Sequence, residues 1–227
     1  MRCRSVSLSC KGKINHLIRL PEIPMSLFVE PEGATQLNAD DVAGLKFDHI
    51  TTREELNELE NANILQGLSW LATTPKTSMD DILSMAFVEE LHQRLLGDVW
   101  EWAGSYRHRE LNIGVDPLNI RPDLHNLLED IKCWIEFEHY DSLELSARIQ
   151  HRLVKIHPFP NGNGRHSRVM TDYIRMVLLK QKPLVWSNTD LDKQSQERGE
   201  YIASLRQADA GDYAPLIQYL QAKGNVT

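Results

Sequence analysis

The sequence HPFPNGNGRHSR, residues 157–168, lies between the two most apolar helical segments of the chain. Gly162 and Gly164 allow backbone amides to approach an anion closely. The next helix begins in the same loop, so its free N–H groups and the positive end of its dipole face that anion. Arg165 and Arg168 are one helical turn apart, which lets two guanidinium groups flank the anion from one side. The pattern therefore predicts a phosphate-binding loop.

His157 stands at the other edge of this loop, where a neutral imidazole can take a proton from an incoming hydroxyl. Taken singly, a Gly-Asn-Gly turn and a histidine after a helix are typical of turns and helix ends. Arginines beside a loop between apolar helices, however, cost desolvation unless an anion is present. A dinucleotide-binding GxGxxG is disfavoured because the loop follows a helix rather than a strand. A zinc site from His151, His157 and His166 is disfavoured because the spacing is not helical ligand spacing and no thiolate is near.

Apolar residues at helical spacing predict that the chain is all-α. The predicted helices cover residues 123–137, 142–156 and 164–180, with the last at the centre of a bundle, and 190–208 and 213–222 further on. Towards the N-terminus, a helix capped by Thr51 or Thr52 is expected to stop at Thr73–Pro75, and a second to run from near Ser78 to Gly97. Tyr106–Val115 is the one place where a strand or hairpin is expected.

Length and composition are those of an ordinary globular protein. The chain has 227 residues, 41% hydrophobic and 25% charged, which leaves room for one sizeable domain. The formal net charge of −7 argues against direct nucleic-acid binding. No apolar run approaches the length of a membrane span. The three cysteines, Cys3, Cys10 and Cys133, are not closely spaced, so reduced thiols and a cytoplasmic setting are expected.

The charge divides the chain into parts. Residues 1–24 carry five basic side chains and one acid, and we interpret them as a basic, disordered tail, with translation starting at Met25 as a hypothesis. Residues 25–50 are predicted to form an irregular arm, residues 51–222 the folded domain and residues 223–227 a short tail.

Residues 157–168 resemble the signature of the Fic (filamentation induced by cyclic AMP) domain, HxFx(D/E)GNGRxxR, with Asn161 in the place of the acid. The segments 102–107, 113–114 and 211–216 are also similar to this family, and the resemblance covers roughly residues 50–220. It is closest to the subgroup called mobile mystery protein B. The resemblance implies a Fic-fold helical bundle with a small β-hairpin flap beside the active-site loop.

The resemblance also implies an activity, which is transfer of AMP from ATP, with Mg²⁺ or Mn²⁺, to a Ser, Thr or Tyr hydroxyl of a target protein. The roles carried over are these: His157 as general base, Phe159 as loop anchor, the Gly162–Gly164 backbone as anion nest, Asn163 orienting phosphate, Arg165 binding the β-phosphate region and Arg168 the γ-phosphate.

Asn161 leaves three outcomes open, because an amide oxygen brings no charge to a divalent cation in the metal-binding position. The first is slow AMP transfer. The second is a Doc-like phosphotransferase, although Gly164 rather than Lys precedes Arg165. The third is loss of catalysis. The alternative function is a catalytically weak nucleotide-binding module that acts as a toxin-like or regulatory partner of a neighbouring DNA-binding, antitoxin-like protein.

Two further roles follow from the resemblance. Glu60-Asn61 is similar to the end of the inhibitory helix (S/T)xxxE(G/N), with Leu56 in the Ser/Thr position, which implies that Glu60 pairs with Arg168. A solvated helical glutamate is the alternative. The expected hairpin would dock the target's extended segment by strand addition, using Tyr106, Arg107, Ile113 and Gly114. Homo-oligomerisation is left open.

Overall fold

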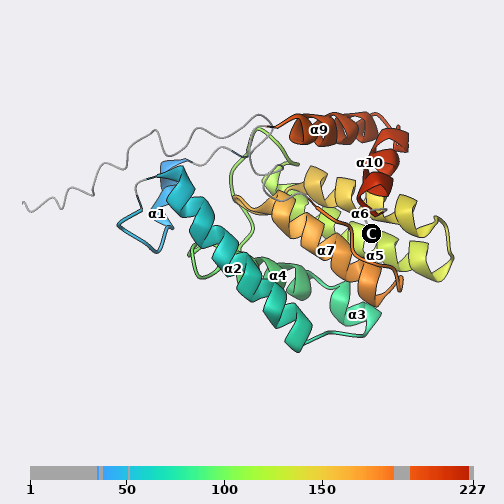
Figure 1. The fold of residues 1–227 in the computed structure, drawn as a ribbon, viewed down its shortest axis with the longest axis horizontal. Helices are drawn as coiled ribbons and strands as arrows, with labels where there is room; N and C mark the ends of the chain where they lie inside the picture. Colours follow the sequence, from blue (N-terminus) through green and yellow to red (C-terminus); the bar gives the residue numbers. More distant parts are fainter. Residues whose placement is uncertain (1–34, 36–37, 51, 187–194, 225–227) are drawn as a thin grey trace, which may run out of the picture.

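The computed structural model describes residues 35, 38–50, 52–186 and 195–224, so the predicted basic tail at 1–24 lies outside the described residues (Figure 1). Within the described ranges the chain is helical, as predicted. Its elements are α1 (Ala39–Ala43), α2 (Arg53–Thr73), α3 (Met79–Ile82), α4 (Met85–Leu96), the 3₁₀ turn η2 (Pro117–Asn119), α5 (Ile120–Glu136), α6 (Ser142–Ile156), α7 (Asn163–Val177), α9 (Gln196–Asp209) and α10 (Ala214–Gly224).

The helices form a bundle with α6 and α7 side by side at its centre (Figure 1). On one side, α2 packs along α4, which also contacts α7. On the other, α5 packs on α6, and α9 and α10 pack on each other and on α6. The pair α6 and α7 therefore connects α2 and α4 on one side to α5, α9 and α10 on the other, and the loop of residues 157–162 joins the two central helices.

Local hydrogen bonding sets the helix starts. Thr52 accepts a hydrogen bond from the Glu55 N–H while the Glu55 carboxylate accepts one from the Thr52 N–H, which forms a capping box for α2. Asp141 caps α6 by accepting hydrogen bonds from the N–H groups of Leu143 and Glu144. These starts were predicted from the sequence because a cap needs only residues within one turn.

The core has two parts. The larger holds buried side chains of α2, α4, α5, α6 and α7, with Phe87, Trp100 and Phe159 among the largest. The smaller joins α9 and α10 to Ala147 on α6 and to Leu184. None of the described helices is long and apolar enough to cross a membrane.

Three expectations from the sequence are corrected. The helix expected from Ser78 to Gly97 is two helices, α3 and α4. Ser84 caps the second one by accepting a hydrogen bond from the Phe87 N–H. The arm is not wholly irregular, since Asn38 forms a capping box that starts α1. The β-hairpin flap is absent from the described residues, and 106–115 contains no strand.

Candidate active site

The candidate site is built around the turn from α6 into α7. His157 ends α6 in the left-handed conformation, with φ 52° and ψ 61°. This conformation is uncommon for a residue with a side chain, and Pro158 disfavours continuation of the helix at the residue before it. Because such backbone strain persists only where the surroundings hold it, His157 is a residue whose position the fold defines closely.

The imidazole of His157 is buried, with 5% of the residue exposed. Burial first, and the charge of Arg107 in addition, lower its pKa to about 4, so the ring is neutral near pH 7. Nδ1 lies 3.1 Å from the Val154 carbonyl oxygen, which can only accept, so Nδ1 carries the proton. Nε2 therefore has a free lone pair, and it accepts a hydrogen bond of 2.6 Å from the Thr35 hydroxyl. This is the state a general base requires.

The buried Arg107 side chain stabilises the loop through hydrogen bonds to backbone carbonyl oxygens. Its guanidinium donates to the carbonyl oxygens of Ile156 and His157, at 3.4 and 2.7 Å, and also to that of Val115. Gly114 leaves room for it, because a Cβ there would lie 2.5 Å from an Arg107 nitrogen. The backbone N–H groups of Arg107 and Val115 donate to carbonyl oxygens of Pro158 and Ile156, and the Val115 carbonyl accepts from the Arg107 side chain. These backbone groups are therefore not paired with each other, as a hairpin would require.

Two of the predicted docking residues, Tyr106 and Arg107, have side chains that are not accessible, and docking of a target by this segment stays a prediction. Tyr106 is buried against Phe159, and Arg107 is only 3% exposed. Ile113 is half-buried and Gly114 is exposed, so only these two of the four predicted docking residues are accessible.

Phe159 is completely buried, and the ring of His92 stacks on it at 3.7 Å between centroids. His92 was not predicted from the sequence. Its Nδ1 accepts from the Gly104 N–H, so its Nε2 carries the proton and donates to the Asn161 carbonyl at 3.0 Å. Burial lowers the pKa of His92 well below its usual value, so the ring stays neutral. A lone histidine on α4 has no sequence pattern that could have shown this contact.

Asn163 also braces the loop. Its side-chain oxygen accepts from the Phe159 N–H at 2.9 Å and its amide donates to the Phe159 carbonyl at 2.8 Å. The residue is 3% exposed. The side chain is therefore engaged within the loop, the backbone N–H lies at the first position of α7, and the phosphate-orienting role of Asn163 stays a prediction.

Gly162 begins α7 with φ +75°, and a Cβ there would lie 2.2 Å from Leu96 Cδ1. No side chain of the described residues caps this helix start. Arg168 folds back over the first turn, since one of its nitrogens is 3.6 Å from where a Cβ of Gly164 would be. The first amides and the positive dipole end of α7, together with the two arginines, form a site suited to an anion.

Glu60 reaches this site from α2, but it meets a different arginine from the one expected. Its carboxylate forms an ion pair of 2.7 Å with Arg165, not the predicted pair with Arg168, and accepts a second 2.7 Å hydrogen bond from the Trp100 indole. Burial alone would raise the pKa of Glu60, but the charge of Arg165 and its hydrogen bond outweigh that and lower it. Glu60 is 2% exposed, so the solvated alternative is wrong.

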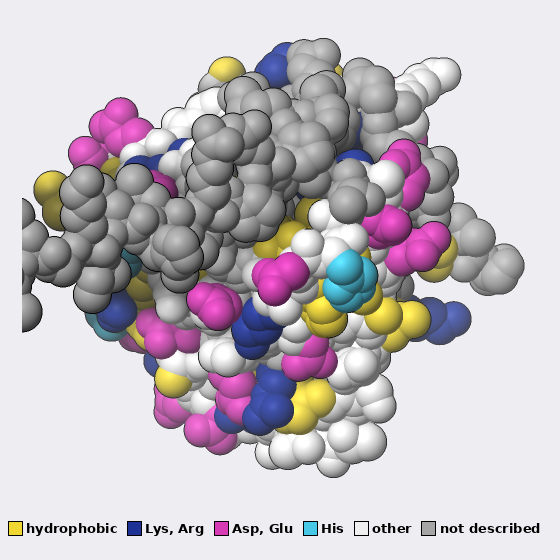
Figure 2. Space-filling view, turned by 90° about the vertical axis from the view of Figure 1, so that its left-hand side faces the viewer, with side chains coloured by type: hydrophobic (Ala, Val, Ile, Leu, Met, Phe, Trp, Pro, Cys, Tyr) yellow, Lys and Arg dark blue, Asp and Glu magenta, His cyan; other side chains and the backbone are white. Residues whose placement is uncertain are grey.

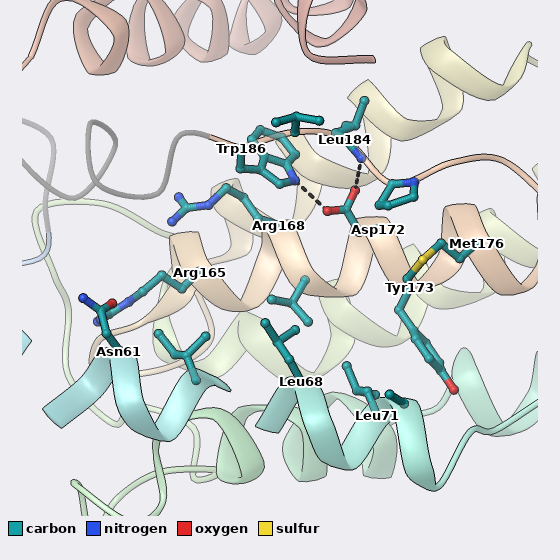
Figure 3. A pocket seen from close by; sticks show the side chains of 15 residues that line it. Asn61, Leu68, Leu71, Arg165, Arg168, Asp172, Tyr173, Met176, Leu184 and Trp186 are labelled. Atoms are coloured by element: carbon teal, nitrogen blue, oxygen red, sulfur yellow. Dashed lines mark hydrogen bonds between the residues drawn. The ribbon is translucent and has the colours of Figure 1, made fainter. Parts of the chain in front are cut away.

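A pocket of about 520 Å³ adjoins the helix start, between α2, α7 and residues 183–186 (Figure 3). Arg165 and Arg168 lie at one end of it, beside Asn61. The rest is mainly apolar and includes Trp186, whose indole donates to Asp172 at 2.7 Å. A pocket that is cationic at one end and apolar with an aromatic ring at the other suits a nucleotide.

The residues present do not fit a resident metal ion. Asn161, in the expected metal position, uses its side-chain oxygen to accept from the Gly162 N–H. Among the described residues there is no cluster of three His, Cys, Asp or Glu side chains that could hold a metal. Of the described residues, only the neutral Asn161 amide therefore stands at the expected metal position.

Comparison with known proteins agrees with this site. Residues 82–174 match the Fic/DOC family, the family that the loop sequence resembles. It is 29% identical over 164 residues to "Protein adenylyltransferase Fic" of Drosophila virilis, and 33% identical over 152 residues to "Protein adenylyltransferase fic-1" of Caenorhabditis elegans. These matches cover 70% and 63% of this chain but only 30% and 26% of the relatives, so the chain spans less than a third of their length.

Solved structures show the same fold. Fic-1 (residues 134–508) from C. elegans superposes with a TM-score of 0.58 at 26% identity, covering 73% of this chain and 49% of that one. BepC from Bartonella tribocorum, solved with bound AMPPNP, superposes with a TM-score of 0.60 at 17% identity, covering 86% and 94%. The latter shows the fold alone.

Proposed function

We propose that this chain is a protein adenylyltransferase that transfers AMP from ATP to a Ser, Thr or Tyr hydroxyl of a target protein. The observation that carries the proposal is the pairing of a neutral, buried His157, whose Nε2 can accept a proton, with a helix start that bears Arg165 and Arg168 and that no described side chain caps. The names of the relatives support the same chemistry.

In the proposed reaction, His157 Nε2 takes the proton of the target hydroxyl as its oxygen attacks the α-phosphorus of ATP. An O–P bond forms to the target, the bond from the α-phosphorus to the bridging oxygen breaks, and pyrophosphate leaves. The amides at the start of α7 and the two arginines hold the phosphates, because phosphoryl-type transfer depends mainly on positioning and charge stabilisation. The apolar pocket beside Trp186 is the proposed place for the base.

Glu60 restrains this reaction in the proposal. Arg165 is held by a buried carboxylate, so phosphate must compete with Glu60 for its guanidinium. The resting chain is then expected to be slow.

The surface is in keeping with a protein substrate rather than a nucleic acid. On the face in Figure 2, the described acidic and basic side chains are interspersed and do not gather into a basic patch. The net charge of −7 points the same way.

The test is incubation of the chain with cell lysate and with α- or γ-labelled ATP, in Mg²⁺ or Mn²⁺. We expect α-label on protein, lowered about 10²- to 10⁴-fold by His157→Ala because the general base is lost. Glu60→Gln should raise labelling, whereas Glu58→Gln on the exposed face of the same helix should not. Transfer of γ-label would instead show Doc-like phosphotransfer, and ATP binding without transfer would show the nucleotide-binding module.

A further inference from the structure

The hydroxyl closest to the candidate base belongs to the chain itself. Thr35 and His157 are 122 positions apart in sequence, yet Thr35 Oγ lies 2.6 Å from His157 Nε2. Thr35 is 6% exposed and His157 is 5% exposed, so water has little access to the contact. A long-range contact between two buried polar groups requires that the fold brings them together.

The direction of this hydrogen bond is determined by the other side of the ring. Nδ1 donates to Val154, and the ring is neutral, so Nε2 accepts and the Thr35 hydroxyl donates. A distance of 2.6 Å from hydroxyl oxygen to base is within the range expected between a general base and the group it deprotonates. Thr35 thus has the position and the proton of an acceptor hydroxyl.

His157 has no remaining ring nitrogen for a second hydroxyl. Nδ1 is bonded to Val154 and Nε2 to Thr35. Any other target hydroxyl must first displace Thr35 from Nε2, whereas Thr35 needs no displacement.

We propose that Thr35 is the first acceptor of this site, so that the chain adenylylates its own N-terminal segment within one molecule. This inference rests on the proposed function, since it names a substrate of that same reaction.

The step balances in the same way as transfer to another protein. The Thr35 proton passes to His157 Nε2, Thr35 Oγ bonds to the α-phosphorus of ATP, and the bond to the bridging oxygen breaks to release pyrophosphate. The product is adenylyl-Thr35, whose ester oxygen has no proton to donate. Thr35 can therefore no longer donate a hydrogen bond to Nε2, and His157 can accept a proton again once it has released the one taken from Thr35.

The test uses the full chain with ATP, in wild-type and Glu60→Gln backgrounds, with intact mass and peptide mapping as readouts. AMP is expected on the peptide containing Thr35. Thr35→Ser, which keeps the hydroxyl, should retain this label, and Thr35→Val, which keeps the shape, should reduce it to background. Thr77→Val, at an exposed threonine, is the matched control and should leave it unchanged.

Transfer within one molecule has its own readout. The rate per chain should not depend on protein concentration, and a tagged His157→Ala chain mixed with wild type should stay unlabelled at Thr35. Label at Thr35 of the His157→Ala chain, or equal labelling of that peptide in Thr35→Val, would overturn the proposal.

Failure here can be separated from failure of the proposed function. If His157-dependent α-label is found on other proteins while Thr35 stays unmodified, the inference is wrong and the proposed function stands. If neither wild type nor Glu60→Gln transfers α-label to any acceptor, both fall.

Discussion

At the scale of single residues, the site depends on which groups are charged and which are neutral. His157 and His92 are neutral because burial lowers their pKa values, whereas Glu60 stays ionised because Arg165 pairs with it. Asn161 contributes no charge, and its oxygen is bonded to the next amide. The loop itself therefore holds arginine charge without an acid of its own.

Asn161→Asp tests this missing charge. The aspartate can still accept from the Gly162 N–H, but it adds a negative oxygen ligand for the divalent cation that accompanies ATP. We expect self-labelling by ATP to rise and the metal concentration for half-maximal labelling to fall by roughly tenfold, as ligand charge sets cation affinity.

The matched control is Asn119→Asp, which adds the same charge at an exposed position at the start of α5. It should leave labelling unchanged. Unchanged or lower labelling in Asn161→Asp would show that residue 161 does not limit a metal-assisted reaction.

At the scale of elements, the site depends on how closely α2 approaches α4. Gly67 on α2 faces the backbone of α4, and a Cβ there would lie 2.8 Å from the Arg94 carbonyl oxygen. This close approach sets the position of α2, and hence of Glu60 two turns earlier on the same helix. Backbone atoms of α4 cannot rotate away as a flexible side chain could.

Gly67→Ala should therefore destabilise the protein, although alanine is the better helix former. Overpacking against backbone typically costs roughly 1–3 kcal/mol, which exceeds the helix-propensity gain of about 1 kcal/mol. The matched control is Gly199→Ala in α9, where the added Cβ would meet no atom of another segment within 4 Å. This change should stabilise the protein by roughly 0.5–1 kcal/mol. Denaturant unfolding measures both, and equal effects of the two substitutions would contradict the predicted close packing of α2 on α4.

At the scale of the whole molecule, buried histidines link stability to pH. Burial lowers the pKa values of both His157 and His166 to about 4, whereas an unfolded histidine titrates near 6.5. Between these values the unfolded chain binds more protons, so the stabilisation is present above about pH 6.5 and is lost as the pH falls to about 4. Burial raises the pKa of Asp172 to about 6, which has the opposite sign and offsets part of this loss.

The free energy of unfolding should accordingly fall as the pH is lowered from 6.5 to 4. His166→Gln should reduce that dependence by up to about 1.4 kcal/mol per pH unit, because one buried titrating group is removed. His125→Gln, at an exposed position, is the control. Thermal unfolding followed against pH measures both, and an identical pH dependence of wild type and His166→Gln would contradict the assignment.

Local patterns in the sequence were sufficient for most of the helices and for proposing an anion site in the loop. The capping box at Thr52 and the periodic apolar residues of α6 and α7 act over one or two turns, so their effect can be predicted without knowing the fold. The glycines and arginines of residues 157–168 likewise indicate an anion site because their roles follow from backbone geometry and charge.

The partners of these groups were decided only by the tertiary structure. Glu60 meets Arg165, Thr35 meets His157 and His92 meets the Asn161 carbonyl, each across at least 69 positions of sequence. Arg107 is buried under the loop instead of lying on a docking hairpin, because its guanidinium satisfies carbonyl oxygens from several segments at once. Spacing along a chain specifies which residues share a helix face, but contacts between distant segments depend on how the helices pack.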